Sequence, residues 1–343
     1  MTNRKTYITV LNVVSCLGVV LLHTANFWNF NKTRGWVAAN FVESFFYFAV
    51  PVFIMISGAT LVDFAERYTM KQYFEKRVKK TVIPFFAWSV ISIIFAICCR
   101  GIENVSLNPI DIINAIIGCQ YMGIYYFFLV IFGIYLSIPV IGSIEKEKRK
   151  KIFEYAIIVF FVVNSLLPFL ASMSGGRIVH NSNFSFYVCS SYLIYVFIGY
   201  YIDNYEMSRR TQLLIYALGA LGFLVHFVGT WYLSFRNNEV TTLFKGYMNV
   251  PCILYSAAIF LLFKKIPFEK FPEYLLKVIT FFSGQTFGIY LIHIFLITIA
   301  DKCFGIAPVR FVPSVLFAFV IFMISGFLIK IMQKIPIIKH IIP

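Results

Sequence analysis

The sequence predicts an all-α fold, a polytopic membrane bundle of about ten transmembrane helices with both termini cytoplasmic. The first observation is composition, because apolar residues make up 60% of the 343 residues and the mean hydropathy is +0.81. Soluble domains contain only about 45–50% apolar residues. The second observation is that lysines and arginines between the long apolar stretches alternate from dense to sparse. Together these features predict a chain that crosses the membrane repeatedly.

Each expected span contains about 20 mainly apolar residues, the length that a helix needs to cross a hydrocarbon core of about 30 Å. A spanning helix is favoured because it satisfies its own backbone hydrogen bonds in lipid. The expected spans are Tyr7–Phe30, Trp36–Leu61, Val82–Cys99, Met122–Gly142, Ile152–Ser172, Phe186–Ile202, Leu213–Leu233, Tyr247–Phe263, Val278–Ala300 and Phe311–Ile331. The stretch Ile110–Gln120 is too short to cross, and we expect it along the outer surface.

The distribution of basic residues predicts the orientation of these spans. With a cytoplasmic N-terminus, 22 of the 30 lysines and arginines face inward and eight lie in outward loops, among them Lys245. Cytoplasmic loops carry an excess of Lys and Arg, so this asymmetry favours two cytoplasmic ends. The same charges are scattered over short loops, which argues against nucleic-acid binding.

Nothing in the sequence marks a second domain, so residues 1–343 are expected to form a single integral membrane domain. The loops are short, and no Gly/Ser-rich or Pro-rich linker separates the spans. The seven cysteines lie mostly inside spans, without C-x-x-C spacing or nearby histidines. We therefore interpret them as packing residues and expect no metal site.

Few ionisable residues occur inside the expected spans, and each is a functional candidate because burial in a membrane is costly. Counting along the helices at 1.5 Å per residue places His23 about 24 Å beyond Tyr7, in the outer third. Glu43, His293 and His226 reach a similar depth by the same count. One layer is thus expected to contain a carboxylate and up to three imidazoles.

An imidazole takes and returns a proton near neutral pH, and a carboxylate holds it in one tautomer, so His23 with Glu43 is equipped for general-base chemistry. Alternatively, each histidine bonds only a hydroxyl or carbonyl of a neighbouring helix. Glu43 is equally suited to carry protons in a transporter. From these residues alone, an enzyme and a transporter or flippase of a lipid-linked sugar or small solute both remain open.

Two further groups of polar residues are candidates for a functional site. Asn12 lies eleven residues before His23, almost three helical turns, so both side chains face the same way. The alternative for Asn12 is hydrogen bonding between helices. Arg77 and Lys80 precede the third span, share a helix face if helical, and could grip a phosphate. Their alternative role is a cytoplasmic topology signal.

These residues resemble, over nearly the whole chain, the acyltransferase-3 family of integral membrane O-acyltransferases in its stand-alone form. The first span from Asn12 to His23 is similar to the family's opening helix, and Val50–Gly58 to its second-span signature. Arg77 and Lys80 match its paired basic motif before the third span. Tyr126–Pro139 resembles the fourth-span block, and Gly288–His293 the late-span block.

The resemblance implies transfer of an acyl group, typically acetyl from cytoplasmic acetyl-CoA, to a hydroxyl of a cell-surface or exported carbohydrate. It implies His23 as the catalytic base oriented by Glu43. Donor contacts would come from Arg77, Lys80 and Asn12, although the family usually has a basic residue at the position of Asn12. His293 and Tyr126 would bind the acceptor.

The resemblance also implies the setting of the reaction. The enzyme would lie in the bacterial plasma membrane, in contact with membrane lipids. No extracellular domain is fused in the stand-alone form. Acetyl would therefore pass directly to the glycan or through a separate extracytoplasmic transferase partner.

Overall fold

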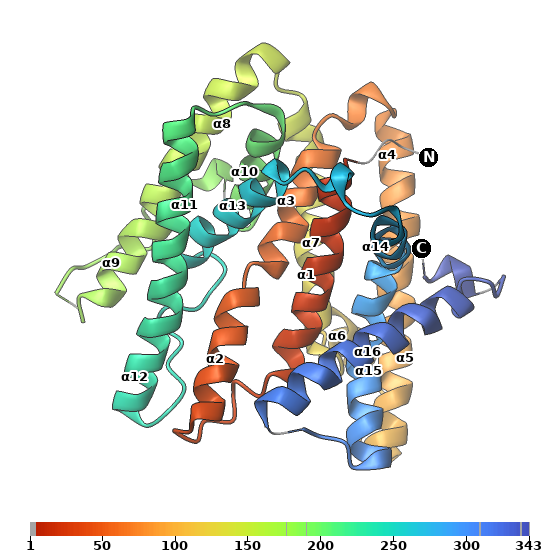
Figure 1. Ribbon diagram of the computed structural model, residues 1–343. Coiled ribbons are helices and arrows are strands. Elements are labelled where there is room, and N and C mark those ends of the chain that lie inside the picture. Colours follow the sequence, from red (N-terminus) through yellow and green to blue (C-terminus); the bar gives the residue numbers. More distant parts are fainter. Residues whose placement is uncertain (1–4, 176, 190, 309, 337, 343) are drawn as a thin grey trace. The chain divides into compact units, whose positions relative to one another are not determined.

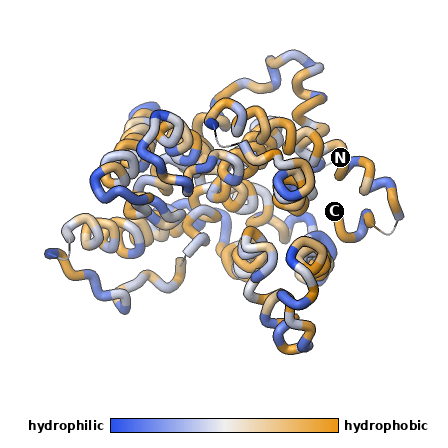
Figure 2. Tube along the Cα trace, turned by 90° about the horizontal axis from the view of Figure 1, so that it is seen from below, coloured by the Kyte–Doolittle hydropathy of each residue, from blue (hydrophilic) through white to orange (hydrophobic). Residues whose placement is uncertain are grey.

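The computed structural model describes residues 5–175, 177–189, 191–308, 310–336 and 338–342 (Figure 1). Within these ranges the secondary structure is helical, with no strand, so the all-α prediction is confirmed. Figure 2 shows apolar residues along most of the helices. Arg4, part of the basic N-terminal segment predicted to be cytoplasmic, lies outside the described residues.

Eight helical stretches in the described part of the chain are long and apolar enough to cross a membrane. They are Thr6–Thr24, Arg34–Glu66, Met70–Arg100, Gly123–Gly142, Lys146–Met173, Arg209–Asn237, Thr286–Phe304 and Phe311–Met332. The other two expected spans correspond to α10 (Leu193–Asn204) and α13 (Val250–Lys265), of 12 and 16 residues. Both helices begin later than expected, since the separate 3-10 helix Tyr187–Cys189 precedes α10 and residues 247–249 form a turn before α13. The count of ten and the placement of the termini stay predictions.

Contacts divide the chain into two compact units, and the prediction of a single domain stays a prediction. Unit 1 comprises Met1–Leu61 with Ile144–Gly326, and unit 2 comprises Val62–Ser143 with Phe327–Pro343. Besides α10 and α13, unit 1 contains α1 (Thr6–Thr24), α2 (Arg34–Phe46), α3 (Ala49–Leu61), α8 (Lys146–Phe160), α9 (Leu167–Met173), α11 (Arg209–Leu224), α12 (Thr230–Asn237), α14 (Glu273–Ser283), α15 (Thr286–Phe304) and most of α16 (Phe311–Met332). Unit 2 contains α4 (Met70–Arg77), α5 (Ile83–Arg100), α6 (Pro109–Ile117), α7 (Tyr126–Gly142) and the end of α16.

Helix α1 is the central element of unit 1. It contacts α2, α3, α13, α14 and α15. Its apolar face joins a buried cluster that includes Val20, Leu21, Ile289 and Phe322. Burial of such side chains stabilises the bundle core by close packing. The position of the His23 side chain is therefore set by α1 and the helices around it.

The second expected span is two helices rather than one. Helix α2 ends at Phe46, and α3 begins at Ala49. Pro51 lies in the first turn of α3, where it cannot donate a hydrogen bond back to the carbonyl of Tyr47. The break leaves the backbone of Tyr47 and Phe48 outside both helices, and it follows Glu43 by one helical turn.

Two glycines let α3 and α10 approach closely. A Cβ atom added to Gly58 would lie 2.2 Å from the carbonyl oxygen of Val196. One added to Gly199 would lie 2.1 Å from the carbonyl oxygen of Met55. Small residues allow helix backbones to approach in membrane proteins, where apolar side chains gain little by leaving lipid.

Unit 2 has its own internal contacts. The Tyr73 hydroxyl of α4 donates to the carbonyl of Tyr135 in α7 at 3.1 Å. The Trp88 indole of α5 donates to the carbonyl of Ile341 at 3.0 Å. Ile93 and Ala96 of α5 form a small buried cluster with Val105, against which the short helix α6 packs. The Tyr73 bond holds α4 against α7, and α4 carries Lys71, Lys76 and Arg77, three of the six basic residues that precede the third span.

Candidate active site

The His23 and His293 imidazoles lie against each other in unit 1. Their ring centroids are 5.3 Å apart, with an angle of 41° between the ring planes. His23 comes from the last turn of α1 and is exposed, whereas His293 comes from the middle of α15 and is fully buried. The His23 ring thus reaches the protein surface, whereas the His293 ring is held inside the bundle.

The protonation pattern of His293 follows from its hydrogen bond. Its Nδ1 lies 3.0 Å from the carbonyl oxygen of Ile289, and a carbonyl only accepts, so Nδ1 carries the hydrogen. In the neutral ring Nε2 is then an acceptor. Nε2 is buried without a hydrogen-bond partner among the described residues. It therefore lacks the donor that a buried acceptor normally bonds.

Asn12 holds α1 to the corner between α14 and α15. Its amide nitrogen lies 2.8 Å from the Thr286 hydroxyl, 3.3 Å from the Ser283 hydroxyl and 3.3 Å from the Ser283 carbonyl oxygen. These bonds correspond to the alternative role, hydrogen bonding between helices, that the sequence left open. The donor contact expected of Asn12 stays a prediction.

The end of α1 is fixed by Asn26. This residue has a left-handed backbone, with φ of 56°, which asparagine tolerates better than most residues. Its amide donates to the Pro308 carbonyl and, at 3.1 Å, to the Ser314 hydroxyl. The turn that follows His23 is thus tied to the beginning of α16.

Glu43 lies on α2 and is paired with a lysine. Its Oε1 is 3.9 Å from Nζ of Lys245, which comes from the loop between α12 and α13. Glu43 thus forms its ion pair with Lys245, whereas the His23 ring packs against the His293 ring. The expected orientation of His23 by Glu43 stays a prediction.

The Glu43–Lys245 pair borders a pocket of about 360 Å³ in unit 1. Its lining residues are Trp28, Glu43, Tyr47, Thr242, Lys245, Gly246 and Tyr247. The Tyr47 and Tyr247 rings are stacked, with centroids 4.8 Å apart. The His226 ring lies 4.7 Å from that of Tyr47, and neither of its nitrogens has a hydrogen-bond partner among the described residues. Polar groups and aromatic rings thus meet at one cavity.

The basic residues of unit 2 are arranged differently from expectation. The Arg77 guanidinium lies against the rings of Tyr73 and Tyr135, at 5.5 and 5.2 Å from their centroids, whereas Lys80 is exposed. Lys80 lies within the π-helical turn Val78–Val82, which begins directly after Arg77 and changes the helical spacing on which the expected shared face depended.

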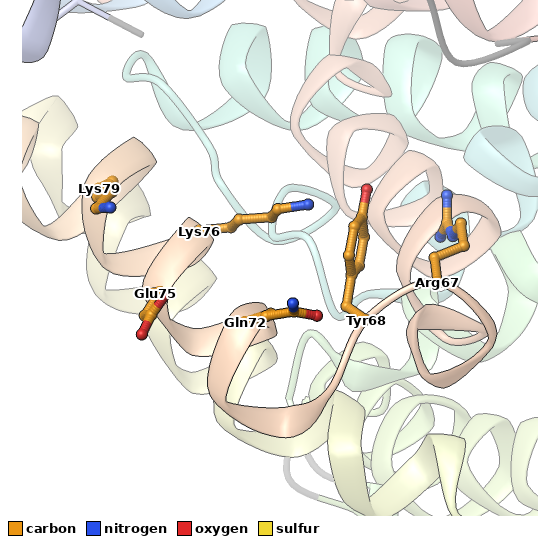
Figure 3. A pocket seen from close by; sticks show the side chains of 6 residues that line it. All are labelled: Arg67, Tyr68, Gln72, Glu75, Lys76 and Lys79. Atoms are coloured by element: carbon orange, nitrogen blue, oxygen red, sulfur yellow. The ribbon is translucent and has the colours of Figure 1, made fainter.

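A basic pocket of about 380 Å³ lies beside Arg77 and Lys80, lined by Arg67, Tyr68, Gln72, Glu75, Lys76 and Lys79. Figure 3 shows the Tyr68 ring between the Arg67 and Lys76 side chains. The Lys76 ammonium lies 3.2 Å from the centroid of this ring. The pocket therefore gathers a different set of cations, from the same region of the sequence.

Tyr126 begins α7 of unit 2 and is 39% exposed, whereas His293 belongs to unit 1. The expected acceptor-binding residues thus come from two units. No group of three His, Cys, Asp or Glu side chains that could hold a metal ion occurs in the described ranges.

Comparison with known proteins decides the family. The family model described as "Acyltransferase domain" matches residues 5–331. The chain belongs to the acyltransferase-3 family. It is also 26% identical over 339 residues to a Bacillus subtilis (strain 168) protein named "Putative membrane-bound acyltransferase YfiQ", covering 92% of this chain and 87% of that protein. No solved structure matches the chain.

Membership in the acyltransferase-3 family supports a multi-pass membrane acyltransferase, and it does not favour the transporter alternative. Residue type and spacing in the sequence were enough to select His23 and the basic pair Arg77 and Lys80 as site candidates. Lys245 was missed as a site residue because its position in an outward loop indicates only a topological charge. Burial lowers the pKa of its ammonium below that of an exposed lysine, although the Glu43 carboxylate opposes this effect.

Proposed function

We propose that this chain transfers an acetyl group from cytoplasmic acetyl-CoA to a hydroxyl of a cell-surface or exported carbohydrate, in the plasma membrane of a bacterium. The observation that carries the proposal is the imidazole pair. It combines an exposed His23 with a buried His293 whose Nδ1 is committed to a carbonyl. In an acyltransferase, such an accessible imidazole is suited to activate a hydroxyl.

In the proposed reaction, His23 takes the proton from the acceptor hydroxyl while the hydroxyl oxygen attacks the thioester carbonyl carbon. A C–O bond forms, the C–S bond breaks, and the CoA thiolate leaves and receives a proton from the His23 imidazolium. His293, which is fully buried, packs against the His23 ring, and the acceptor contact expected of it stays a prediction. Glu43, which lines the pocket in the same unit as His23, would contact the acceptor.

The proposed donor contacts lie in unit 2. The phosphates of acetyl-CoA carry negative charge, and ammonium and guanidinium groups bind phosphate by charge-assisted hydrogen bonds. Arg77 and Lys80 are the residues expected from the sequence, and the pocket of Arg67, Lys76 and Lys79 adds three cations beside them. The Tyr68 ring, which lies between Arg67 and Lys76, holds these two cations at the pocket.

The proposed acceptor lies outside the cytoplasm, and membrane lipids surround the spans. Acetyl passes either directly to the glycan or through a separate extracytoplasmic transferase. Either route starts with acceptor-dependent cleavage of the thioester.

The test is a turnover assay with the purified protein in lipid bilayers, acetyl-labelled acetyl-CoA and candidate carbohydrates. We expect release of free CoA that depends on the acceptor. Replacement of His23 by Ala should lower kcat about 10²- to 10⁴-fold, because general-base catalysis contributes this much.

His340→Ala is the matched control, because His340 is an exposed histidine of a short C-terminal turn. It should leave turnover unchanged. Accumulation of a carbohydrate across the bilayer without thioester cleavage would instead indicate transport and would overturn the proposal.

A further inference from the structure

The unusual feature of the Glu43–Lys245 pair is that both groups are buried but incompletely bonded. The Lys245 side chain is 4% exposed and the Glu43 side chain 7%. Their closest atoms are 3.9 Å apart, about 1 Å longer than a charge-assisted hydrogen bond. Nζ of Lys245 and Oε2 of Glu43 have no hydrogen-bond partner among the described residues. A purely structural ion pair would not leave both groups open in this way.

Two aromatic rings also lie beside the Lys245 ammonium. Its Nζ lies 4.0 Å from the centroid of the Phe27 ring and 5.2 Å from that of Tyr47. Contacts with ring faces stabilise the cation without using its N–H groups. The ammonium is thus held in place at the pocket while its hydrogens stay available.

We propose that the Glu43–Lys245 pocket is the recognition site for a neutral sugar ring of the acceptor, an inference that rests on the proposed function. A hydroxyl both donates and accepts, so one hydroxyl satisfies the carboxylate and the ammonium together. An anionic ligand is opposed by Glu43, and a cationic ligand is opposed by Lys245. The site therefore selects uncharged polyols over uronic acids and amino sugars.

The walls of the pocket fit the same ligand. Trp28, which is 65% exposed, and the stacked rings of Tyr47 and Tyr247 provide flat apolar surfaces. Sugar rings present C–H groups on their faces and hydroxyls at their edges, which matches aromatic walls with polar groups between them. The volume of about 360 Å³ is near the lower end for small-molecule sites, about 300–1,000 Å³. It suits a single ring rather than a polymer segment.

The test uses three probes with the protein in lipid bilayers: methyl glucoside, methyl glucuronide and methyl glucosaminide. Binding is measured by the change in tryptophan fluorescence, which needs no turnover, and acceptor-dependent CoA release is measured in parallel. We expect the wild-type protein to bind the neutral glycoside about tenfold more tightly than either charged one. Trp28→Phe should remove most of the fluorescence change.

The variants separate binding from catalysis and from folding. Glu43→Gln and the double variant Glu43→Gln/Lys245→Met should raise the acceptor KM or Kd about 10- to 100-fold with little change in kcat. The double variant leaves no single buried charge, and its thermal unfolding checks that it folds. Lys302→Met, an exposed lysine at the end of α15, is the matched control and should bind like the wild type.

Two outcomes would overturn the inference. One is equal binding of the three probes, and the other is a Glu43→Gln variant with a lower kcat and an unchanged KM, which would support orientation of His23 instead. Neither affects the proposed function, which fails only if no acceptor gives His23-dependent CoA release. In that case the fluorescence measurement still decides whether the pocket binds a neutral sugar.

Discussion

Buried polar side chains in unit 1 fall into two groups. Asn12 makes hydrogen bonds to Thr286 and Ser283, so its position is explained by helix packing. Lys245, Glu43 and His293 each have one buried polar atom without a partner among the described residues. Because such atoms are costly in a membrane protein, the second group indicates where a ligand binds.

Asn12→Ala should reduce stability rather than donor binding. Hydrogen bonds between membrane helices contribute about 0.6 kcal/mol on average and at most about 1.7. We expect the free energy of unfolding to fall by about 1 kcal/mol, measured by thermal unfolding in detergent. Asn183→Ala, at an exposed loop residue, is the control. A raised KM for acetyl-CoA at unchanged Tm would support the donor contact expected from the sequence.

Among the helical elements, the π-helical turn Val78–Val82 determines which basic side chains can act together. It directly follows Arg77, the last residue of α4, whose guanidinium lies against the rings of Tyr73 in the same helix and of Tyr135 in α7. Lys76 and Lys79, by contrast, line one pocket with Arg67. A local change of helical repeat thus alters which cations share a face.

Arg67→Gln/Lys76→Gln should raise the KM for acetyl-CoA about tenfold, because each lost cation removes a charge-assisted contact with phosphate. The effect should shrink as salt screens these exposed charges. Lys71→Gln is the matched control, since Lys71 is an exposed lysine of α4 outside the pocket. A larger increase for Arg77→Ala than for the double variant would assign the phosphates to Arg77 instead.

The α3–α10 crossing depends on its glycines. Gly58→Ala should lower the free energy of unfolding by about 1–3 kcal/mol, because the new methyl group overlaps the backbone of Val196. Gly133→Ala is the control on α7, where nothing lies within 4 Å of the added Cβ. It should be neutral or stabilising by up to about 1 kcal/mol. Equal melting temperatures for the two variants would contradict this account of the crossing.

At the scale of the whole molecule, the charge asymmetry predicts the orientation in the membrane. In a cysteine-free background, Lys302→Cys should react with a membrane-impermeant maleimide in intact cells. Lys148→Cys and Lys339→Cys should react only after the membrane is opened, because both lie in segments expected to be cytoplasmic. Labelling of position 339 in intact cells would refute the predicted cytoplasmic C-terminus.

The sequence by itself determined that the chain is helical and crosses the membrane, because long apolar runs leave the backbone few other ways to satisfy its hydrogen bonds. Depth counting also put His23 and His293 in one layer, since the rise per residue of a helix is fixed. The tertiary structure decided that their rings lie together and that α10 and α13 are shorter than the expected spans. Only it joined Lys245 to Glu43. Rise fixes depth, but the rotation of each helix and the path of each loop depend on packing between segments far apart in the sequence.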